Sequence, residues 1–112
     1  MIQCDQWDVV LVPFPFTNLE TVKKRPALVI SPNDYNRGED IIILFITSNL
    51  SSFGRPGDYK LMDWKLCGLP KPSIVRMKFA TVLQRIIIKK MGRLTKRDRT
   101  KVREALSTFF QT

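Results

Sequence analysis

Arg25 and Thr47 are the two residues whose type and position best suit chemistry on a phosphate group. Arg25 stands where a polar loop enters a predicted strand, and Thr47 stands where the most apolar predicted strand ends. An arginine guanidinium carries five donors in a planar fork that suits a phosphorane, and a threonine hydroxyl can donate to a phosphate oxygen. The alternative is structural, with Arg25 as one of three basic loop residues and Thr47 as an ordinary β-branched strand end.

The residue types that are missing narrow the reaction. The 112-residue chain contains no histidine, which excludes Ser-His-Asp hydrolases, histidine zinc sites and two-histidine nucleases. Its acids are isolated apart from the pair at 39–40, and it has no glycine-rich phosphate loop. We therefore expect neither a metal nor a cofactor. Arginine and threonine could support the attack of an RNA 2′-hydroxyl on its neighbouring phosphate, because the substrate itself supplies the nucleophile.

Such a reaction also needs proton transfer. Glu20, in the loop beside Arg25, is the weakest of the three catalytic candidates. A water molecule or Arg25 itself could serve in its place.

Basic residues outnumber acidic ones 19 to 10, which gives a net charge of +9. Residues 1–70 carry seven basic and eight acidic residues, whereas residues 71–112 carry twelve and two. The excess favours a polyanionic partner, which could be nucleic acid, an anionic membrane surface or an acidic protein. A solvated basic face on a terminal helix remains the alternative.

The sequence predicts one domain over 1–112, mainly β, with five or six short antiparallel strands closed into a small barrel or curled sheet. The strands are expected at 8–16, 26–31, 41–47, 73–79 and 81–90, with 59–61 as the optional sixth, and loops at 17–24, 32–40 and 48–57. The 41–47 segment is apolar on both faces and should be central. Pro13 and Pro15 confine their part of the first strand to an edge or an end.

A helix is expected to open at Thr95, with Asp98 at the spacing of a capping box. One apolar stripe follows, at Val102, Ala105, Leu106, Phe109 and Phe110, and should pack on the sheet. Cys4 and Cys67 have no metal-binding spacing, and two buried thiols are favoured over a disulfide. There is no signal peptide and no apolar run of membrane-spanning length, so we expect a cytoplasmic protein without a membrane partner.

Several segments resemble the PemK/MazF family of toxin endoribonucleases, from Asp8 to about Phe110. They are WDVVLVPFPFTNLETVKKRPALVISPNDYN, IIILFITSN, GLPKPSIVR and the G-x-L-T opening of the last helix. The resemblance implies an SH3-like barrel of the PemK/CcdB type and a homodimer. It implies metal-independent cleavage of single-stranded RNA, leaving a 2′,3′-cyclic phosphate. It also implies a cognate antitoxin whose acidic, partly disordered segment occupies the RNA groove.

The family's catalytic arginine, before a proline, corresponds to Arg25, and its catalytic threonine corresponds to Thr47. The chain departs from the family at Trp7, where the family has glycine, and at Leu83-Gln84, where the family has an aspartate. Trp7 could stack a base or pack across a dimer. The residues assigned to RNA binding are Trp7, Lys23, Lys24, Ser48, Arg55, Arg76, Lys78 and Arg85.

Two other functions remain open at this point. One is a protein-binding poison of the same fold, like the gyrase-directed CcdB toxins, which an apolar C-terminal tail would favour. We expect Phe109 and Phe110 to belong to the core instead. The other is a catalytically silent nucleic-acid-binding subunit, against which Arg25 and Thr47 argue.

Overall fold

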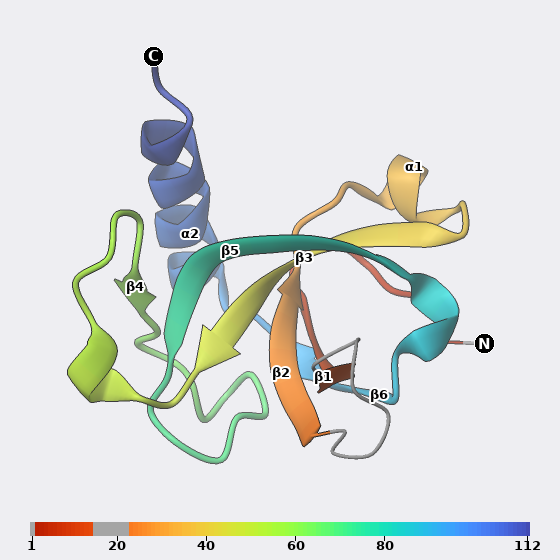
Figure 1. Cartoon of the computed structure of the whole chain (residues 1–112), viewed down its shortest axis with the longest axis horizontal. Coiled ribbons are helices and arrows are strands. Elements are labelled where there is room, and N and C mark those ends of the chain that lie inside the picture. Colours follow the sequence, from red (N-terminus) through yellow and green to blue (C-terminus); the bar gives the residue numbers. More distant parts are fainter. Residues whose placement is uncertain (1, 15–22) are drawn as a thin grey trace.

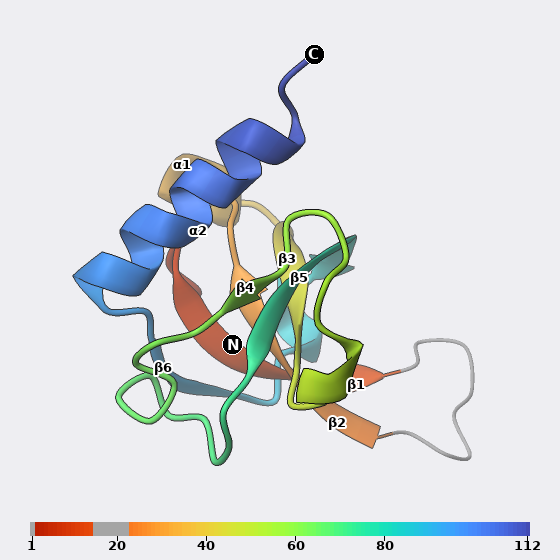
Figure 2. The ribbon, with the colours of Figure 1, turned by 90° about the vertical axis from the view of Figure 1, so that its left-hand side faces the viewer.

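The computed structural model describes residues 2–14 and 23–112. Six antiparallel strands form one curled sheet in the order β4-β5-β3-β2-β1-β6, and the helix α2 packs on one of its faces (Figures 1 and 2). The strands are β1 (Asp8–Phe14), β2 (Lys23–Val29), β3 (Asp40–Thr47), β4 (Tyr59–Lys60), β5 (Ile74–Leu83) and β6 (Lys89–Arg93). The helices are α1 (Asn33–Asn36) and α2 (Lys96–Phe109), with single 3₁₀ turns η2 (Leu50–Ser52) and η3 (Gln84–Ile86). The predicted mainly β fold with a C-terminal helix is therefore confirmed.

Strand β3 is central, as its apolar sequence predicted. Alternate side chains point to opposite faces of a strand, so Ile41 and Ile43 join one buried cluster while Leu44 and Ile46 join another. The second cluster lies between the sheet and α2 and includes Val102 of the helix. Both faces of β3 are thus covered, which fixes the position of Thr47 at its end.

Strand β5 differs from the prediction of two strands at 73–79 and 81–90. It is one continuous strand with a bulge. Leu44 pairs with Phe79 and the next residue, Phe45, pairs with Arg76, so two residues of β5, 77 and 78, have no partner on β3. Such a bulge bends the strand. The chain then turns at the buried Gln84, whose side chain accepts from the Cys4 backbone N–H at 2.6 Å and donates to the Asn36 carbonyl at 2.9 Å. These long-range bonds end the strand where the local sequence gave no stop signal.

Helix α2 begins after Thr95 as predicted, but the capping box does not form. The Thr95 hydroxyl donates to Asp63, and Asp98 is fully buried beneath the helix. The Asp98 carboxylate accepts bonds from the Tyr59 hydroxyl and from the backbone N–H groups of Met62 and Asp63. Asp98 therefore fastens α2 to the 61–63 segment.

The apolar stripe of α2 is buried at its beginning and exposed at its end, which corrects the prediction for Phe109 and Phe110. Val102 is fully buried, whereas Phe109 and Phe110 are 40% and 62% exposed. Their rings lie 5.9 and 5.4 Å from that of Phe79 on β5. The last turn of α2 extends past the sheet (Figure 1), so these rings meet one another on the surface.

Both cysteines are buried free thiols, as expected. Burial raises the pKa of Cys4 and of Cys67 to about 11, which leaves the unreactive thiol form at neutral pH. Within the residues that the structure describes, neither helix has the length and apolarity needed to cross a bilayer.

Candidate functional site

Arg25 on β2 and Thr47 at the end of β3 lie together at one end of the sheet. The last registered pair of these two strands is Ala27 with Phe45. Arg25 and Thr47 each lie two residues further along, so strand alternation places them on the same face as that pair. Both side chains line two adjoining hollows, which together we call the Arg25–Thr47 groove.

The first hollow, the Phe45 hollow, has a volume of about 380 Å³. It is lined by Phe14, Arg25, Phe45, Ile46, Thr47, Asn49, Arg55, Arg76 and Lys78. Four of these side chains are cations and none of them is an acid. The hollow therefore suits a negatively charged ligand.

The second hollow, the Pro26 hollow, has a volume of about 260 Å³ and continues the first on the other side of Arg25 and Thr47. Its further polar lining comes from Lys24, Ser48, Lys71 and Ser73. Since Arg25 and Thr47 line both hollows, a strand laid along the groove would pass directly over them.

The local chain conformation orients the Thr47 hydroxyl. The backbone N–H of Asn49 donates to Thr47 Oγ1 at 3.1 Å, so the oxygen accepts this bond and its own proton stays available for donation. The Arg25 side chain is exposed, and none of the residues described around it forms an ion pair or hydrogen bond with its guanidinium. Both groups can therefore donate to a ligand in the groove.

Arg76 is held rigidly at the wall of the Phe45 hollow. Its guanidinium donates to the two carboxylate oxygens of Asp58 at 3.1 and 2.9 Å, and to the carbonyl and hydroxyl oxygens of Ser52. Asp58 also accepts the backbone N–H groups of Gly54 and Arg55. Burial favours a higher pKa for Asp58, but the Arg76 bond and the two backbone bonds outweigh it and lower that pKa. The pair therefore holds the Arg76 guanidinium in a fixed position at this wall.

Aromatic rings form the apolar floor of the same hollow. Phe14 and Phe45 contact each other edge to face, with centroids 5.0 Å apart. The Lys78 ammonium lies 5.1 and 5.4 Å from the two ring centroids, within cation–π distance. Lys78 lies in the β5 bulge two residues after Arg76, so strand alternation places it on the face that Arg76 and Thr47 share.

The groove brings together most of the residues that the sequence assigned to catalysis and RNA binding. The residues gathered there are Arg25, Thr47, Lys24, Ser48, Arg55, Arg76 and Lys78. Lys23 is exposed at the start of β2, opposite Phe14, and lines neither hollow. Lys23 and Lys24 belong to a strand and not to the predicted loop. Glu20 lies outside the described residues.

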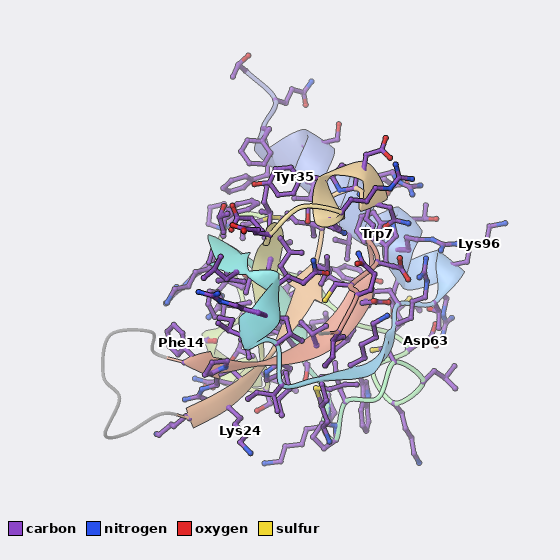
Figure 3. The ribbon with its side chains drawn as sticks, turned by 90° about the vertical axis from the view of Figure 1, so that its right-hand side faces the viewer. Trp7, Phe14, Lys24, Tyr35, Asp63 and Lys96 are labelled. Carbon is purple, nitrogen blue, oxygen red and sulfur yellow. The ribbon has the colours of Figure 1, made fainter. Side chains whose placement is uncertain are left out.

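Arg85 and Trp7 were also assigned to RNA binding, but neither lines the Arg25–Thr47 groove. Arg85 is on η3, after Leu83, which pairs with Asp40 at the end of β3 opposite Thr47. Trp7 is 5% exposed in the core under α2 and so offers no ring face for base stacking. Figure 3 shows Trp7 well apart from Phe14 and Lys24, which mark the groove end of the sheet.

The backbone of Trp7 explains the glycine that the resembled family has there. Trp7 has a φ of 75°, in the left-handed region that favours glycine. Its N–H donates to the Val29 carbonyl at 2.7 Å and its carbonyl accepts from Leu94 at 3.0 Å. The turn thus keeps a conformation suited to glycine, and the core accommodates the indole.

Sequence reasoning missed several contributors to the groove, among them Phe14, Phe45, Asn49 and Lys71. Phe45 could have been found, because it lies two residues before Thr47 on the same strand face. Lys71 gave no local signal, since only the path of the 61–73 segment brings it to the groove. Among residues 2–14 and 23–112, no three cysteine or acidic side chains gather where they could hold a metal ion.

The whole chain, and not only the groove, resembles known proteins. A family model described as PemK-like, MazF-like toxin of type II toxin–antitoxin system matches residues 5–110. No curated protein gives a significant sequence match.

Solved structures share the fold at low sequence identity. A MazE–MazF complex from Deinococcus radiodurans has 22% identity and a TM-score of 0.76, covering 96% of each chain. An endoribonuclease bound to its cognate antitoxin, from a mycobacterial species, has 18% identity and a TM-score of 0.74, covering 97% of this chain and 94% of its own. The Mycobacterium tuberculosis toxin MazF-mt6 has 17% identity and a TM-score of 0.71, covering 92% and 95%.

Proposed function

This chain belongs to the PemK-like, MazF-like toxin family of type II toxin–antitoxin systems, and we propose that it is a metal-independent endoribonuclease that cleaves single-stranded RNA. The observation that carries the proposal is the position of Arg25 and Thr47. Both line the two hollows of one groove, whose other charged lining residues are all basic. Two solved structures of the same fold bear the name endoribonuclease.

The cations of the groove bind and orient the RNA backbone, with Arg55, Arg76 and Lys78 along the Phe45 hollow. A nucleotide base packs against the ring pair of Phe14 and Phe45 at the hollow's floor. The scissile phosphate lies between Arg25 and Thr47, where the two hollows meet. Duplex RNA is a poor substrate, because its backbone cannot be splayed across the groove.

In the chemical step the 2′-oxygen bonds to phosphorus as the bond from phosphorus to the 5′-oxygen breaks. Arg25 donates to the non-bridging oxygens, where negative charge increases in the phosphorane, and Thr47 donates to one of them. The 2′-proton passes to water and the 5′-oxygen takes a proton from water. Asp58 is a poor base for this step because Arg76 engages it and its pKa is lowered. The products are a 2′,3′-cyclic phosphate and a 5′-hydroxyl.

The working unit is a homodimer, and the aromatic cluster at Phe79, Phe109 and Phe110 is its candidate contact surface. These rings contact one another, with centroids 5.1 to 5.9 Å apart, yet all three are at least 36% exposed. Exposed contiguous aromatic surface typically marks a protein interface. A cognate antitoxin with an acidic, partly disordered segment neutralises the enzyme by occupying the cationic groove.

A protein-binding toxin is the second candidate function, and the exposure of Phe110 favours it. The sequence argument against such a toxin was that Phe109 and Phe110 belong to the core, but both are exposed. A gyrase-directed toxin would use this end of α2 as its contact surface. It would act without RNA cleavage and without any requirement for Arg25.

The experiment is single-turnover cleavage of a labelled single-stranded oligoribonucleotide in excess chelator. We expect wild-type protein to cut and to leave a cyclic phosphate, and Arg25→Ala to bind the RNA but not cut it. Wild-type protein that does not cut the RNA would overturn the proposal. Cleavage that disappears with chelator and returns with magnesium would overturn it too. If RNA is not cut while a gyrase assay shows inhibition, the second candidate replaces the first.

A further inference from the structure

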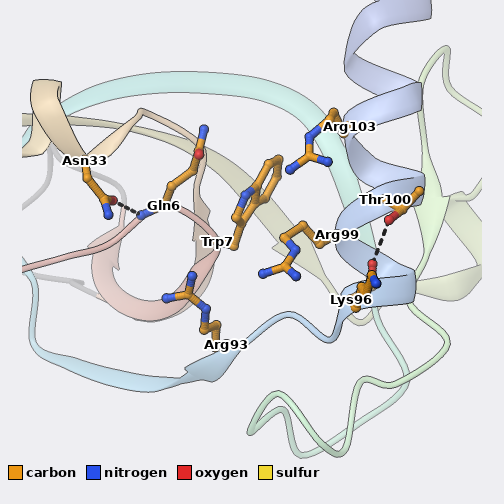
Figure 4. Close-up of a pocket in the computed structure, with 8 residues that line it drawn as sticks. All are labelled: Gln6, Trp7, Asn33, Arg93, Lys96, Arg99, Thr100 and Arg103. Carbon is orange, nitrogen blue, oxygen red and sulfur yellow. Dashed lines mark hydrogen bonds between the residues drawn. The ribbon is translucent and has the colours of Figure 1, made fainter.

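A second cationic cavity, the α2 basic cavity, lies beside the beginning of α2 and has a volume of about 290 Å³ (Figure 4). Its cations are Arg93, Lys96, Arg99 and Arg103, and its neutral polar side chains include Gln6 and Asn33. The cations come from β6 and α2, while Gln6 lies before β1 and Asn33 begins α1. Elements far apart in the sequence therefore form one concave site.

Three of the four cations of this cavity have no acidic partner among the described residues. Lys96, Arg99 and Arg103 follow one another at three- and four-residue spacing, which places them on one face of the helix. Over the part of the chain that the structure describes, no acid forms an ion pair with any of the three, and no acid lines the cavity. Arg93 forms an ion pair with Asp8 at 3.7 Å. Like charges held this close repel one another unless an anion lies between them.

The lining offers little accessible apolar surface. Trp7 is the one apolar residue that lines the cavity, and it is 5% exposed. The Arg103 guanidinium lies over its ring at 5.5 Å. A peptide partner usually depends on apolar anchors, and this cavity has no open pocket for one. The backbone of a nucleic acid, which binds through phosphate contacts alone, fits it better.

The cavity and the Arg25–Thr47 groove lie at opposite ends of β1. Asp8 pairs with Arg93 at the cavity end, and Phe14 pairs with Lys23 at the groove end. Phe14 lies six positions after Asp8 along the strand, a separation of about 20 Å. Figure 3 shows Trp7 and Lys96 on one side and Phe14 and Lys24 on the other. A ligand in the cavity therefore leaves the groove open.

We propose that the α2 basic cavity binds a phosphodiester group of the single-stranded RNA outside the segment that occupies the cleavage groove. This inference rests on the proposed RNA substrate. A flexible single strand can insert one phosphate into a concave cavity, whereas a duplex carries its phosphates on a broad convex surface. The cavity adds sequence-independent affinity for long RNA and takes no part in the chemical step.

The test compares the variant Lys96→Gln/Arg99→Gln with the control Lys65→Gln/Lys101→Gln, which removes the same charge from exposed positions outside the cavity. Arg103 is kept, so the cover over Trp7 is unchanged. Binding is measured by fluorescence anisotropy across a salt series. The probe is an uncleavable 2′-O-methyl RNA of about 20 nucleotides, longer than the roughly 4–16 nucleotides that a small domain covers. Thermal melting checks that both variants are folded.

We expect the cavity variant to bind the long RNA about tenfold more weakly than the control does. Its salt slope should be shallower by about 0.7 for each RNA phosphate that the cavity no longer neutralises. Cleavage of a short RNA that fills only the groove should be unchanged. Equal affinities and slopes for the two variants would overturn the inference while leaving the proposed function intact.

Two further probes identify the chemistry. A selective loss of binding to polyglutamate would assign the cavity to an acidic protein, and a selective loss of binding to duplex DNA would assign it to a duplex. Either result overturns the single-strand assignment. Absence of RNA binding and cleavage by the wild-type protein would instead be a failure of the proposed function.

Discussion

Arg25 and Thr47 each lie two residues beyond the last registered pair of β2 and β3, which is Ala27 with Phe45. Strand alternation therefore presents both side chains on one face of the sheet. The two strands are fixed up to that pair by the burial of Ala27 and by the half-buried ring of Phe45. A guanidinium and a hydroxyl are thus held where the two hollows of the groove meet.

Replacement of Arg25 tests stabilisation of the phosphorane. We expect Arg25→Ala to slow single-turnover cleavage by about 10²-fold or more, because a positioned donor to the transition state is removed. RNA affinity should fall much less, since other cations hold the strand. Arg25→Lys should rescue poorly, because a point charge cannot replace the planar fork. Wild-type cutting by Arg25→Ala would remove Arg25 from the mechanism.

Thr47→Val separates the hydroxyl from the shape of the side chain. The variant keeps the β-branched volume but lacks the oxygen that accepts the Asn49 N–H. We expect a lower single-turnover rate at saturating RNA, a near-normal dissociation constant and little change in melting temperature. Thr47→Ser, which keeps the hydroxyl, is the matched control and should cut faster than Thr47→Val. Equal rates for the two variants would show that the hydroxyl is not used.

Asp58→Asn should weaken the wall of the Phe45 hollow and destabilise the fold. The Asp58 side chain is 1% exposed and accepts four hydrogen bonds, so an amide leaves Arg76 without its counter-charge. We expect a decrease of about 1–3 kcal/mol in the free energy of unfolding, measured with urea. Asp34→Asn, at a pair exposed to solvent, should change it by less than about 0.5 kcal/mol. Similar values for the two variants would contradict this role.

Asp63 should make stability depend on pH in acid. Hydrogen bonds from Arg97 and then Thr95 lower the pKa of Asp63 from 3.8 to about 2. Between these values the unfolded chain binds more protons than the folded one, so stability rises with pH from about 2 to about 4. Asp63→Asn should flatten that part of the curve in urea unfolding from pH 2 to 5. An unchanged slope would show that Asp63 does not contribute.

Light scattering tests the homodimer and its aromatic contact surface. The chain mass is 13.0 kDa, so we expect about 26 kDa, twice that value, at micromolar concentration. Phe110 is 62% exposed, and Phe110→Asp should give the monomer mass without loss of folding. Met62→Asp, at an apolar side chain that is 57% exposed outside the cluster, is the control. A dimer that survives Phe110→Asp would place the interface elsewhere.

The sequence by itself determined the class of fold and named Arg25 and Thr47 as candidates for the site. The apolar segment at 41–47 predicts a central strand because a strand buried on both faces cannot carry alternating polar residues. Thr47 and Arg25 became candidates as polar residues at the ends of apolar strands, and the resemblance to the PemK/MazF family supplied their expected catalytic roles. The start of α2 at Thr95 was also readable, since helix initiation depends on nearby residues.

The tertiary structure decided what depends on contacts between distant segments. Gln84 ends β5 through hydrogen bonds to Cys4 and Asn36. The residues near Gln84 in the sequence do not predict this strand end. Asp98 bonds to the 61–63 segment instead of capping its own helix, because burial makes those distant donors its nearest partners. The register of the sheet brings Arg76 and Lys78 beside Thr47 and keeps Arg85 away.

The tertiary structure also decided which apolar and cationic side chains form surfaces. The periodicity of α2 predicted one buried stripe, but how far a stripe is covered depends on the sheet beneath it, and Phe110 remains 62% exposed although it contacts Phe79. The sequence placed the excess of positive charge in residues 71–112 but did not show which cations share a surface. Only the folded chain gathers this charge into the Arg25–Thr47 groove and the α2 basic cavity, which lie at opposite ends of β1.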